Sequence, residues 1–373
     1  MENTSVNALL QMLKISKAAL RAGELRGRSV VYHRREVLDE AAGFLRENPA
    51  GTLVPFGVKN TAQIGAALVE RLRALPGWLF HTVDKMAERG RAIDTDLVNP
   101  LTGRVMTGSS SASCVHILKG LNDLAIGTDG GGSVLAPALS TGLYAIMAKG
   151  LGLKGDIARV STDRIPFLPG LGVIANRYEL CQKAIAELTG IPPLSSGELD
   201  AQRIVVALPK RGSAALPDGR DMRQMLEKVR AALSDRVTWT EREFPATAER
   251  NPLIAFCQEL FREDVDVVLT MEGPVELEGT GDSVLGQWGS TGARLQQQSG
   301  KYLLKVANLV DATAVALPAG ELAAGLLLLG RPGVAAGRAV IKLGELLQPL
   351  YPAPEVFTQY FRDGYQAEDK GFI

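Results

Sequence analysis

A run of glycines forces a sharp turn in the first half of the chain. Residues 127–133 read Gly-Thr-Asp-Gly-Gly-Gly-Ser and complete an apolar segment, Leu124–Gly127, that we predict to be a strand. Consecutive glycines adopt backbone conformations that side chains forbid, and they can aim successive N–H groups in one direction. The segment is therefore either an ordinary tight turn or an oxyanion hole. In the second case the N–H groups belong to Gly130, Gly131, Gly132 and Ser133.

Strand-like and helix-like runs alternate along the chain, and this alternation predicts parallel α/β structure. We expect strands at residues 52–58, 203–208 and 265–270 and helices at residues 62–75, 221–233 and 338–347. The most apolar stretch, Ala312–Gly330, is interrupted by Pro318 and Glu321, so it is too short to span a membrane and is predicted to be a buried strand pair. We predict one domain over residues 1–373, with a helical region at residues 1–50.

The charge balance and the cysteines exclude several classes of function. The chain has 41 Lys and Arg residues against 41 Asp and Glu residues. No strong field therefore favours nucleic acid or an anionic membrane, and a small molecule is the expected partner. Cys114, Cys181 and Cys257 are too few and too widely spaced for a disulfide framework or a metal site, which indicates a reducing cytoplasm. The start of the chain has an amphipathic helical pattern rather than that of a signal peptide.

A serine-rich run precedes the glycine turn. Residues 107–113 read Thr-Gly-Ser-Ser-Ser-Ala-Ser, which taken alone is typical of a flexible linker. Apolar residues with helical spacing begin at Cys114, so the run, with Ser109 and Ser110, lies where a helix begins. The first N–H groups of a helix lack partners and attract negative charge. Such an end can position a reactive hydroxyl.

A serine nucleophile needs a base, and lysine is the better candidate in this sequence. His33, His81 and His116 have no motif around them and are expected to be structural. Lys59 ends the apolar run Leu53–Val58, which should carry it into the interior, and burial lowers the pKa of a lysine. The alternative for Lys59 is an ordinary solvated strand end.

These segments resemble the motifs of the amidase signature family. The matching segments are Pro55–Asn60 (Pro-Phe-Gly-Val-Lys-Asn), Asn99-Pro100 followed by Gly108-Ser109-Ser110, Gly127–Ser133, and residues 266–270 and 308–330. The similarity covers about residues 53–348. It implies a single α/β domain with a central mixed sheet flanked by helices on both sides.

The resemblance also implies a Ser-cisSer-Lys triad. Ser133 would be the nucleophile, Ser109, preceded by a cis peptide bond, would relay protons, and Lys59 would be the general base. The N–H groups of residues 130–133 would hold the oxyanion and Ser110 would steady the site. Asp129 would brace the glycine turn rather than react. No metal and no cofactor are implied.

The sequence departs from the family pattern close to the triad. Leu135 stands where the family commonly has Arg, Ser111-Ala112 replaces the usual Gly-Gly, and the chain is short. A trimmed chain implies a more open pocket or a site completed by a second copy or a small accessory subunit.

The variable segment 279–298 is predicted to be irregular. Its candidates to bind a substrate carboxylate or ring are Gln287, Trp288 and Arg294.

The sequence contains one further glycine motif and is compatible with two further functions. Gly150–Gly155 has the Gly-x-Gly-x-x-Gly spacing of dinucleotide-binding turns, but no long helix follows it, so no cofactor is predicted. The expected function is hydrolysis of a small carboxamide. The alternatives are a glutaminase-type subunit that passes ammonia to a partner enzyme, and a non-catalytic protein that keeps the amidase fold.

Overall fold

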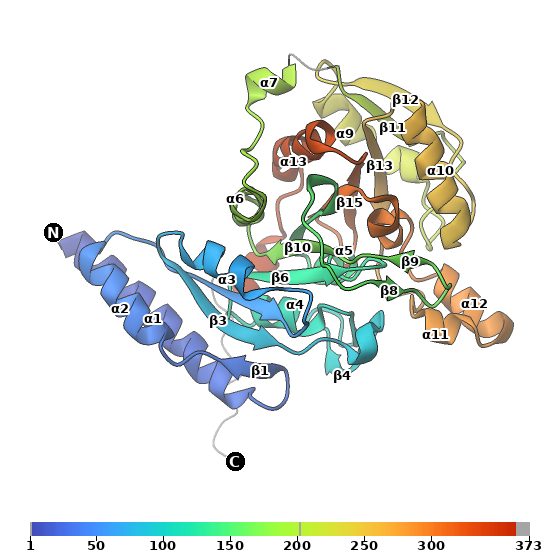
Figure 1. Cartoon of the computed structure of the whole chain (residues 1–373). Coiled ribbons are helices and arrows are strands. Elements are labelled where there is room, and N and C mark those ends of the chain that lie inside the picture. The colour runs from blue at the N-terminus through green and yellow to red at the C-terminus, as the bar shows by residue number, and fades with distance from the viewer. Residues whose placement is uncertain (1, 201–202, 363–373) are drawn as a thin grey trace.

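A mixed sheet of 11 strands runs through the part of the chain that the computed structural model describes, residues 2–200 and 203–362 (Figure 1). Its strands are β1 (Val30–His33), β2 (Val54–Lys59), β3 (Trp78–Asp84), β6 (Leu124–Asp129), β7 (Tyr144–Ala148), β10 (Gly170–Ala175), β11 (Val205–Pro209), β12 (Thr238–Arg242), β13 (Val267–Glu272), β14 (Thr313–Pro318) and β15 (Gly325–Gly330). They follow the order β1-β3-β2-β6-β10-β7-β14-β15-β13-β11-β12. Two small ribbons stand apart from this sheet, β4 (Ile93–Val98) with β5 (Val105–Thr107) and β8 (Arg159–Val160) with β9 (Pro166–Phe167).

The strands change direction along the sheet. β2 is parallel to β3 and β6, and β11 is parallel to β12 and β13. The strands between these two groups pair antiparallel. The alternation of runs alone therefore predicted the wrong direction for the central strands, whereas the mixed sheet implied by the family resemblance is confirmed. The apolar stretch 312–330 is a strand pair as predicted, since β14 and β15 are antiparallel neighbours and fully or nearly buried.

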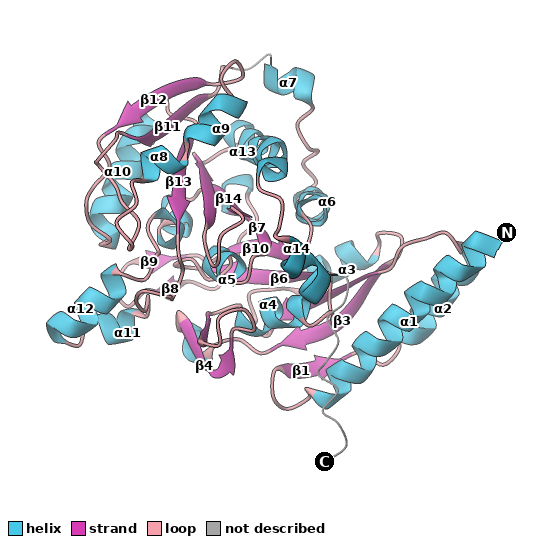
Figure 2. Cartoon of the chain, turned by 180° about the vertical axis from the view of Figure 1, so that it is seen from behind, coloured by secondary structure: helices cyan, strands magenta, loops and turns pink. Residues whose placement is uncertain are grey.

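Helices cover both faces of the sheet (Figures 1 and 2). The longer ones are α1 (Glu2–Glu24), α2 (Val37–Glu47), α3 (Ala66–Arg73), α4 (Ser111–Leu118), α6 (Tyr178–Thr189), α10 (Arg250–Arg262), α12 (Gly289–Gln297) and α13 (Val334–Leu347). The shorter ones are α5 (Leu135–Ser140), α7 (Ser196–Asp200), α8 (Met222–Met225), α9 (Glu227–Ala232), α11 (Ser283–Gly286) and α14 (Glu355–Phe357). α4 and α5 pack together on one face of the central strands, and α3, α6 and α13 pack on the other. Tyr178 of α6 donates a hydrogen bond to the carbonyl of Ile341 in α13 at 2.7 Å, which joins the second layer.

The first two helices form a layer of their own at the edge of the molecule (Figure 2). α1 and α2 lie side by side there and are joined by the edge strand β1. Ile15 of α1 and Val37, Ala41 and Leu45 of α2 are buried in a small apolar cluster separate from the main core. Among the described residues, no helix combines the length and the apolar character needed to cross a bilayer.

Two of the expected elements differ in the structure. The single helix expected at residues 221–233 is divided into α8 and α9 at Leu226, whose N–H turns back to the carbonyl of Arg223 and tightens the chain there. The segment 279–298, expected to be irregular, is helical. Asp282 caps α11 by accepting a hydrogen bond from the N–H of Val284, and α12 follows directly.

Candidate active site

The glycine turn follows β6 and is built around one buried carboxylate. Asp129, the last residue of β6, accepts hydrogen bonds from the N–H groups of Gly132 and Val134, each at 2.7 Å. Burial raises the pKa of Asp129, and these N–H donors oppose that effect. Asp129 therefore holds the turn in shape, the role that the sequence predicted for it.

The glycines of the turn lie against side chains that leave no room for a Cβ. A Cβ on Gly130 would lie 2.5 Å from the Phe167 ring, and one on Gly131 would lie 2.7 Å from a guanidinium nitrogen of Arg250. Gly132 has a φ of +97°, which favours glycine. The Gly132 N–H is already donated to Asp129. The N–H groups of Gly130, Gly131 and Ser133 make no hydrogen bond to any described residue, and they remain available to a ligand.

Lys59 reaches the same place from the neighbouring strand. β2 and β6 are parallel, so their carboxyl ends meet at one edge of the sheet. Lys59 is the last residue of β2 and is only 3% exposed. Its Nζ lies 2.7 Å from Ser109 Oγ and 3.1 Å from the carbonyl oxygen of Thr128. The expected burial of Lys59 is thus observed, and the solvated strand end is excluded.

Burial changes the acid–base character of Lys59. Desolvation lowers its pKa to about 7, with the Arg159 charge acting in the same direction and the Asp129 charge opposing it. A neutral amine is therefore abundant near neutral pH. Such a lysine can accept a proton from a neighbouring hydroxyl.

The paired serines link Lys59 to the glycine turn. The peptide bond between Gly108 and Ser109 is cis, as the resemblance implied. Ser110, directly before α4, donates its N–H to the carbonyl oxygen of Ser133 at 3.2 Å. The Ser110 hydroxyl is fully buried beside Gly127 and lacks a hydrogen-bond partner among the described residues. The structure therefore brings the predicted residues Lys59, Ser109, Ser110 and Ser133 together at one site.

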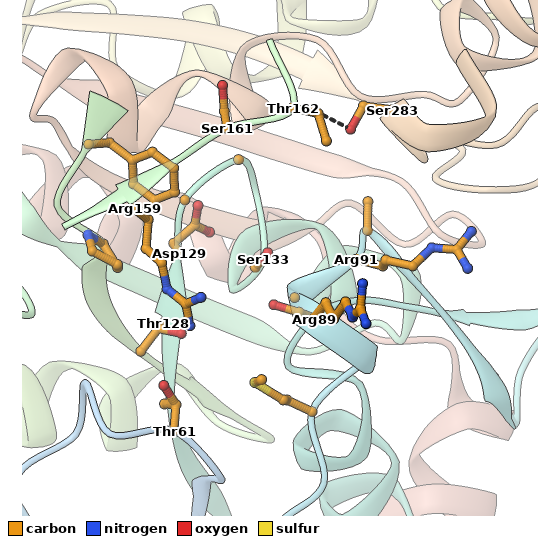
Figure 3. A pocket seen from close by; sticks show the side chains of 18 of the residues that line it. Thr61, Arg89, Arg91, Thr128, Asp129, Ser133, Arg159, Ser161, Thr162 and Ser283 are labelled. Carbon is orange, nitrogen blue, oxygen red and sulfur yellow. Dashed lines mark hydrogen bonds between the residues drawn. The ribbon is translucent and has the colours of Figure 1, made fainter. Parts of the chain in front are cut away.

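A cavity of about 520 Å³ opens over these residues (Figure 3). Lys59, Ser109, Ser133, Gly130 and Gly131 all line it. Its volume lies within the range typical of small-molecule sites. The walls also come from the β8–β9 ribbon, the segment 86–92, the start of α10 and the start of α11.

The cavity has a charged wall that the sequence did not predict. Its charged residues outside the predicted site are Glu88, Arg89, Arg91, Arg159, Arg250 and Asp282. Gln287, Trp288 and Arg294, the residues expected to bind substrate, do not line it, and Trp288 is 79% exposed. The prediction was correct only in pointing to the segment 279–298, which contributes Asp282, Ser283 and Val284 instead. Charged residues in short segments carry no periodic signal, so nothing in the sequence singled them out.

The histidines do not line this cavity, and two of them have buried structural partners. His116 Nδ1 lies 2.7 Å from Asp84 Oδ1, and its Nε2 lies 2.8 Å from Ser29 Oγ. His81 Nδ1 lies 3.0 Å from the carbonyl oxygen of Leu121. The predicted structural role of these two histidines agrees with these contacts.

The described residues contain no group of three or more His, Cys, Asp or Glu side chains that could hold a metal ion.

The glycine motif at residues 150–155 follows β7 and overlaps the short 3-10 helix Lys149–Leu151. It therefore lacks the long helix whose N-terminus binds a dinucleotide pyrophosphate.

Comparison with known proteins shows the fold. The peptide amidase from Stenotrophomonas maltophilia superposes with a TM-score of 0.59 at 17% identity, covering 92% of this chain and 94% of that chain. An allophanate hydrolase from Kluyveromyces lactis gives a TM-score of 0.60 at 16% identity, covering 92% and 71%. The crystal structure of another amidase superposes with a TM-score of 0.55 at 18% identity, covering 92% of this chain and 96% of that chain. No family model and no curated protein sequence matches the chain. The predicted resemblance to the amidase signature family is thus confirmed at the level of the fold.

Proposed function

We propose that this chain, which has the amidase fold, is an amidase that hydrolyses the C–N bond of a small carboxamide through an acyl-enzyme on Ser133. The observation that carries the proposal is the contact of 2.7 Å between Lys59 Nζ and Ser109 Oγ at the floor of a cavity that Ser133 also lines. A buried lysine with a pKa of about 7 is otherwise costly to keep in a protein interior.

The proposed reaction begins with two proton transfers. Neutral Lys59 accepts the hydroxyl proton of Ser109, Ser109 accepts that of Ser133, and Ser133 Oγ bonds to the amide carbon. The oxyanion that forms is stabilised by the free N–H groups of Gly130, Gly131 and Ser133. Ser109 then returns a proton to the amide nitrogen, the C–N bond breaks, and the amine leaves. Water cleaves the acyl ester by the same route.

The buried, unpaired cysteines suit a reducing compartment, so we place this activity in the cytoplasm. In the proposed reaction neither a metal nor a cofactor takes part. Amide hydrolysis by this route needs only the side chains and N–H groups named above.

The test is intact-protein mass spectrometry after treatment with a fluorophosphonate probe. We expect a single adduct on the wild type and none on Ser133→Ala or Lys59→Ala. Ser161→Ala is the matched control, because Ser161 lines the same cavity without belonging to the proposed triad, and its adduct should remain. An adduct that persists in Ser133→Ala would assign the nucleophile elsewhere. A correctly folded wild type without any adduct would contradict the amidase proposal.

A further inference from the structure

The cavity over Ser133 contains a cation that no carboxylate of the described chain neutralises. Arg91 forms an ion pair with Asp282, and Arg250 forms one with Asp163. Arg89 lies 3.9 Å from Glu88, but both side chains are more than 80% exposed, so that pair is weak. Arg159 has neither an ion pair nor a hydrogen bond to a described residue.

Arg159 is also placed close to the reacting groups. It lies on β8, in the ribbon whose other strand carries Phe167 onto Gly130. Figure 3 shows its side chain extending into the cavity toward Thr128, on the opposite side of Ser133 from Arg89 and Arg91. Its charge acts on Lys59, whose pKa it lowers. Arg159 is exposed and lines the cavity, so its guanidinium is accessible to a ligand that enters there.

We infer that Arg159 binds a carboxylate of the substrate, so that the preferred substrate is a small amide carrying a carboxylate group. A guanidinium presents parallel N–H donors that match the two oxygens of a carboxylate. A carboxylate that enters the cavity loses part of its hydration, and Arg159 supplies charge and hydrogen bonds in its place. The inference rests on the proposed amidase function, because it concerns the substrate of the same site.

The same contact orients the substrate. With its carboxylate at Arg159, a short amide extends along the cavity floor toward the N–H groups of Gly130, Gly131 and Ser133. Its amide carbonyl is then presented to Ser133, while Phe167 and Val160 supply apolar surface beside the connecting carbons. A neutral amide lacks the first contact and leaves Arg159 unpaired. Discrimination against neutral amides follows from this difference.

The binding test uses pairs of compounds that differ only in charge. Malonamate, succinamate and glutaramate are each compared with the neutral diamide of the same length, by calorimetry on the Ser133→Ala variant, which cannot turn them over. We expect at least one anionic amide to bind about tenfold or more tightly than its diamide, since hydrogen bonds to charged groups are the stronger ones. The preference should disappear in Ser133→Ala/Arg159→Gln and be reversed toward cationic amides in Ser133→Ala/Arg159→Glu.

A control variant and a kinetic readout complete the test. Arg230→Gln removes an exposed arginine on α9 outside the cavity and should leave the preference unchanged. In the wild type, kcat/KM for the anionic amide divided by that for the diamide should equal about ten or more, and Arg159→Gln should lower this ratio toward one. Equal binding of every pair would overturn the inference, even if neutral amides were hydrolysed. A charge preference in binding without any turnover would instead contradict the amidase function and leave the carboxylate site standing.

Discussion

The burial of Lys59 has two opposite effects: it makes the side chain a better proton acceptor, and it lowers the stability of the folded chain. As the proposed base, Lys59 must be neutral, and burial lowers its pKa to about 7, so that neutral amine is present near neutral pH. Below pH 7 it becomes charged and can no longer accept the proton of Ser109. We therefore expect kcat/KM for a neutral amide to fall about tenfold per pH unit on the acid side, with a midpoint near pH 7.

Arg159 provides an internal check on that pH profile. Because its charge lowers the pKa of Lys59, Arg159→Gln should move the acid midpoint to higher pH, while Arg230→Gln should not move it. The measurement is kcat/KM against pH from 5 to 9 for the three proteins. An acid midpoint that stays fixed in Arg159→Gln would show that the titrating group is not within reach of Arg159.

The second property of Lys59 is its effect on stability. Its pKa in the folded state, about 7, is below the ordinary value of 10.5, so the unfolded chain binds more protons between these two pH values. The stability of the wild type should therefore rise with pH from 7 to 10.5. Lys59→Met has a similar volume and no charge, and it should be more stable by about 1 to 3 kcal/mol at pH 6, after the loss of two hydrogen bonds is included.

Urea unfolding of both proteins at several pH values measures this effect. The advantage of Lys59→Met should be constant below pH 7 and shrink above it, while its activity is lost throughout. A Lys59→Met variant that is less stable than the wild type at pH 6 would mean that the charged lysine is better solvated than its burial indicates.

At the scale of elements, the turn after β6 depends on the conformation of one glycine. Gly132 and Gly152 both have positive φ, +97° and +89°. A Cβ on Gly132 would lie 2.8 Å from Leu304 Cδ1, whereas a Cβ on Gly152 would meet nothing within 4 Å. Gly152→Ala should therefore cost only the backbone penalty of about 1 kcal/mol. Gly132→Ala should cost more and displace the N–H groups of its neighbours.

The expected result is a functional difference between the two variants. Gly132→Ala should lower kcat by about 100-fold or more, the effect of losing an oxyanion donor, while Gly152→Ala should keep its kcat. Steady-state kinetics and thermal melting of both variants make the comparison. If both variants had the same kcat, the turn would tolerate a change of shape and the oxyanion role of its N–H groups would be wrong.

The elements that the sequence predicted well are those whose signal is local. The strand ending at Lys59 and the turn from Asp129 to Ser133 are contiguous motifs, and both lie where expected. The break at Leu226 and the cap of α11 each depend on one hydrogen bond, from the Leu226 N–H to the Arg223 carbonyl and from the Val284 N–H to the Asp282 carboxylate. The sequence pattern does not reveal such single contacts. Arg159 lies on a two-residue strand, too short for any periodic pattern.

At the scale of the whole molecule, the cavity is assembled from segments far apart in the chain. Lys59 and Ser133 come from the first half, and α10 and α11 bring Arg250 and Asp282 from the second. The chain has equal numbers of acidic and basic residues, so its composition did not predict a cationic cavity. These charges come together only in the folded chain, where loops, the β8–β9 ribbon and two helix starts meet around the cavity.

The ion pair between Arg91 and Asp282 ties the two halves together across the cavity rim, over 191 positions of sequence. Asp282 is almost fully buried, pairs with Arg91 and caps α11. Asp282→Ala removes both contacts and should loosen one wall of the cavity, while Lys59 and Ser133 are unchanged. We expect KM to rise about five- to tenfold while kcat changes by less than about threefold, because the lost contact positions the wall rather than the reacting atoms. Glu198→Ala, which breaks an ion pair with Arg338 away from the cavity, is the matched control and should leave both constants unchanged. A fall in kcat as large as the rise in KM would mean that the two halves must be held together for the chemical step itself.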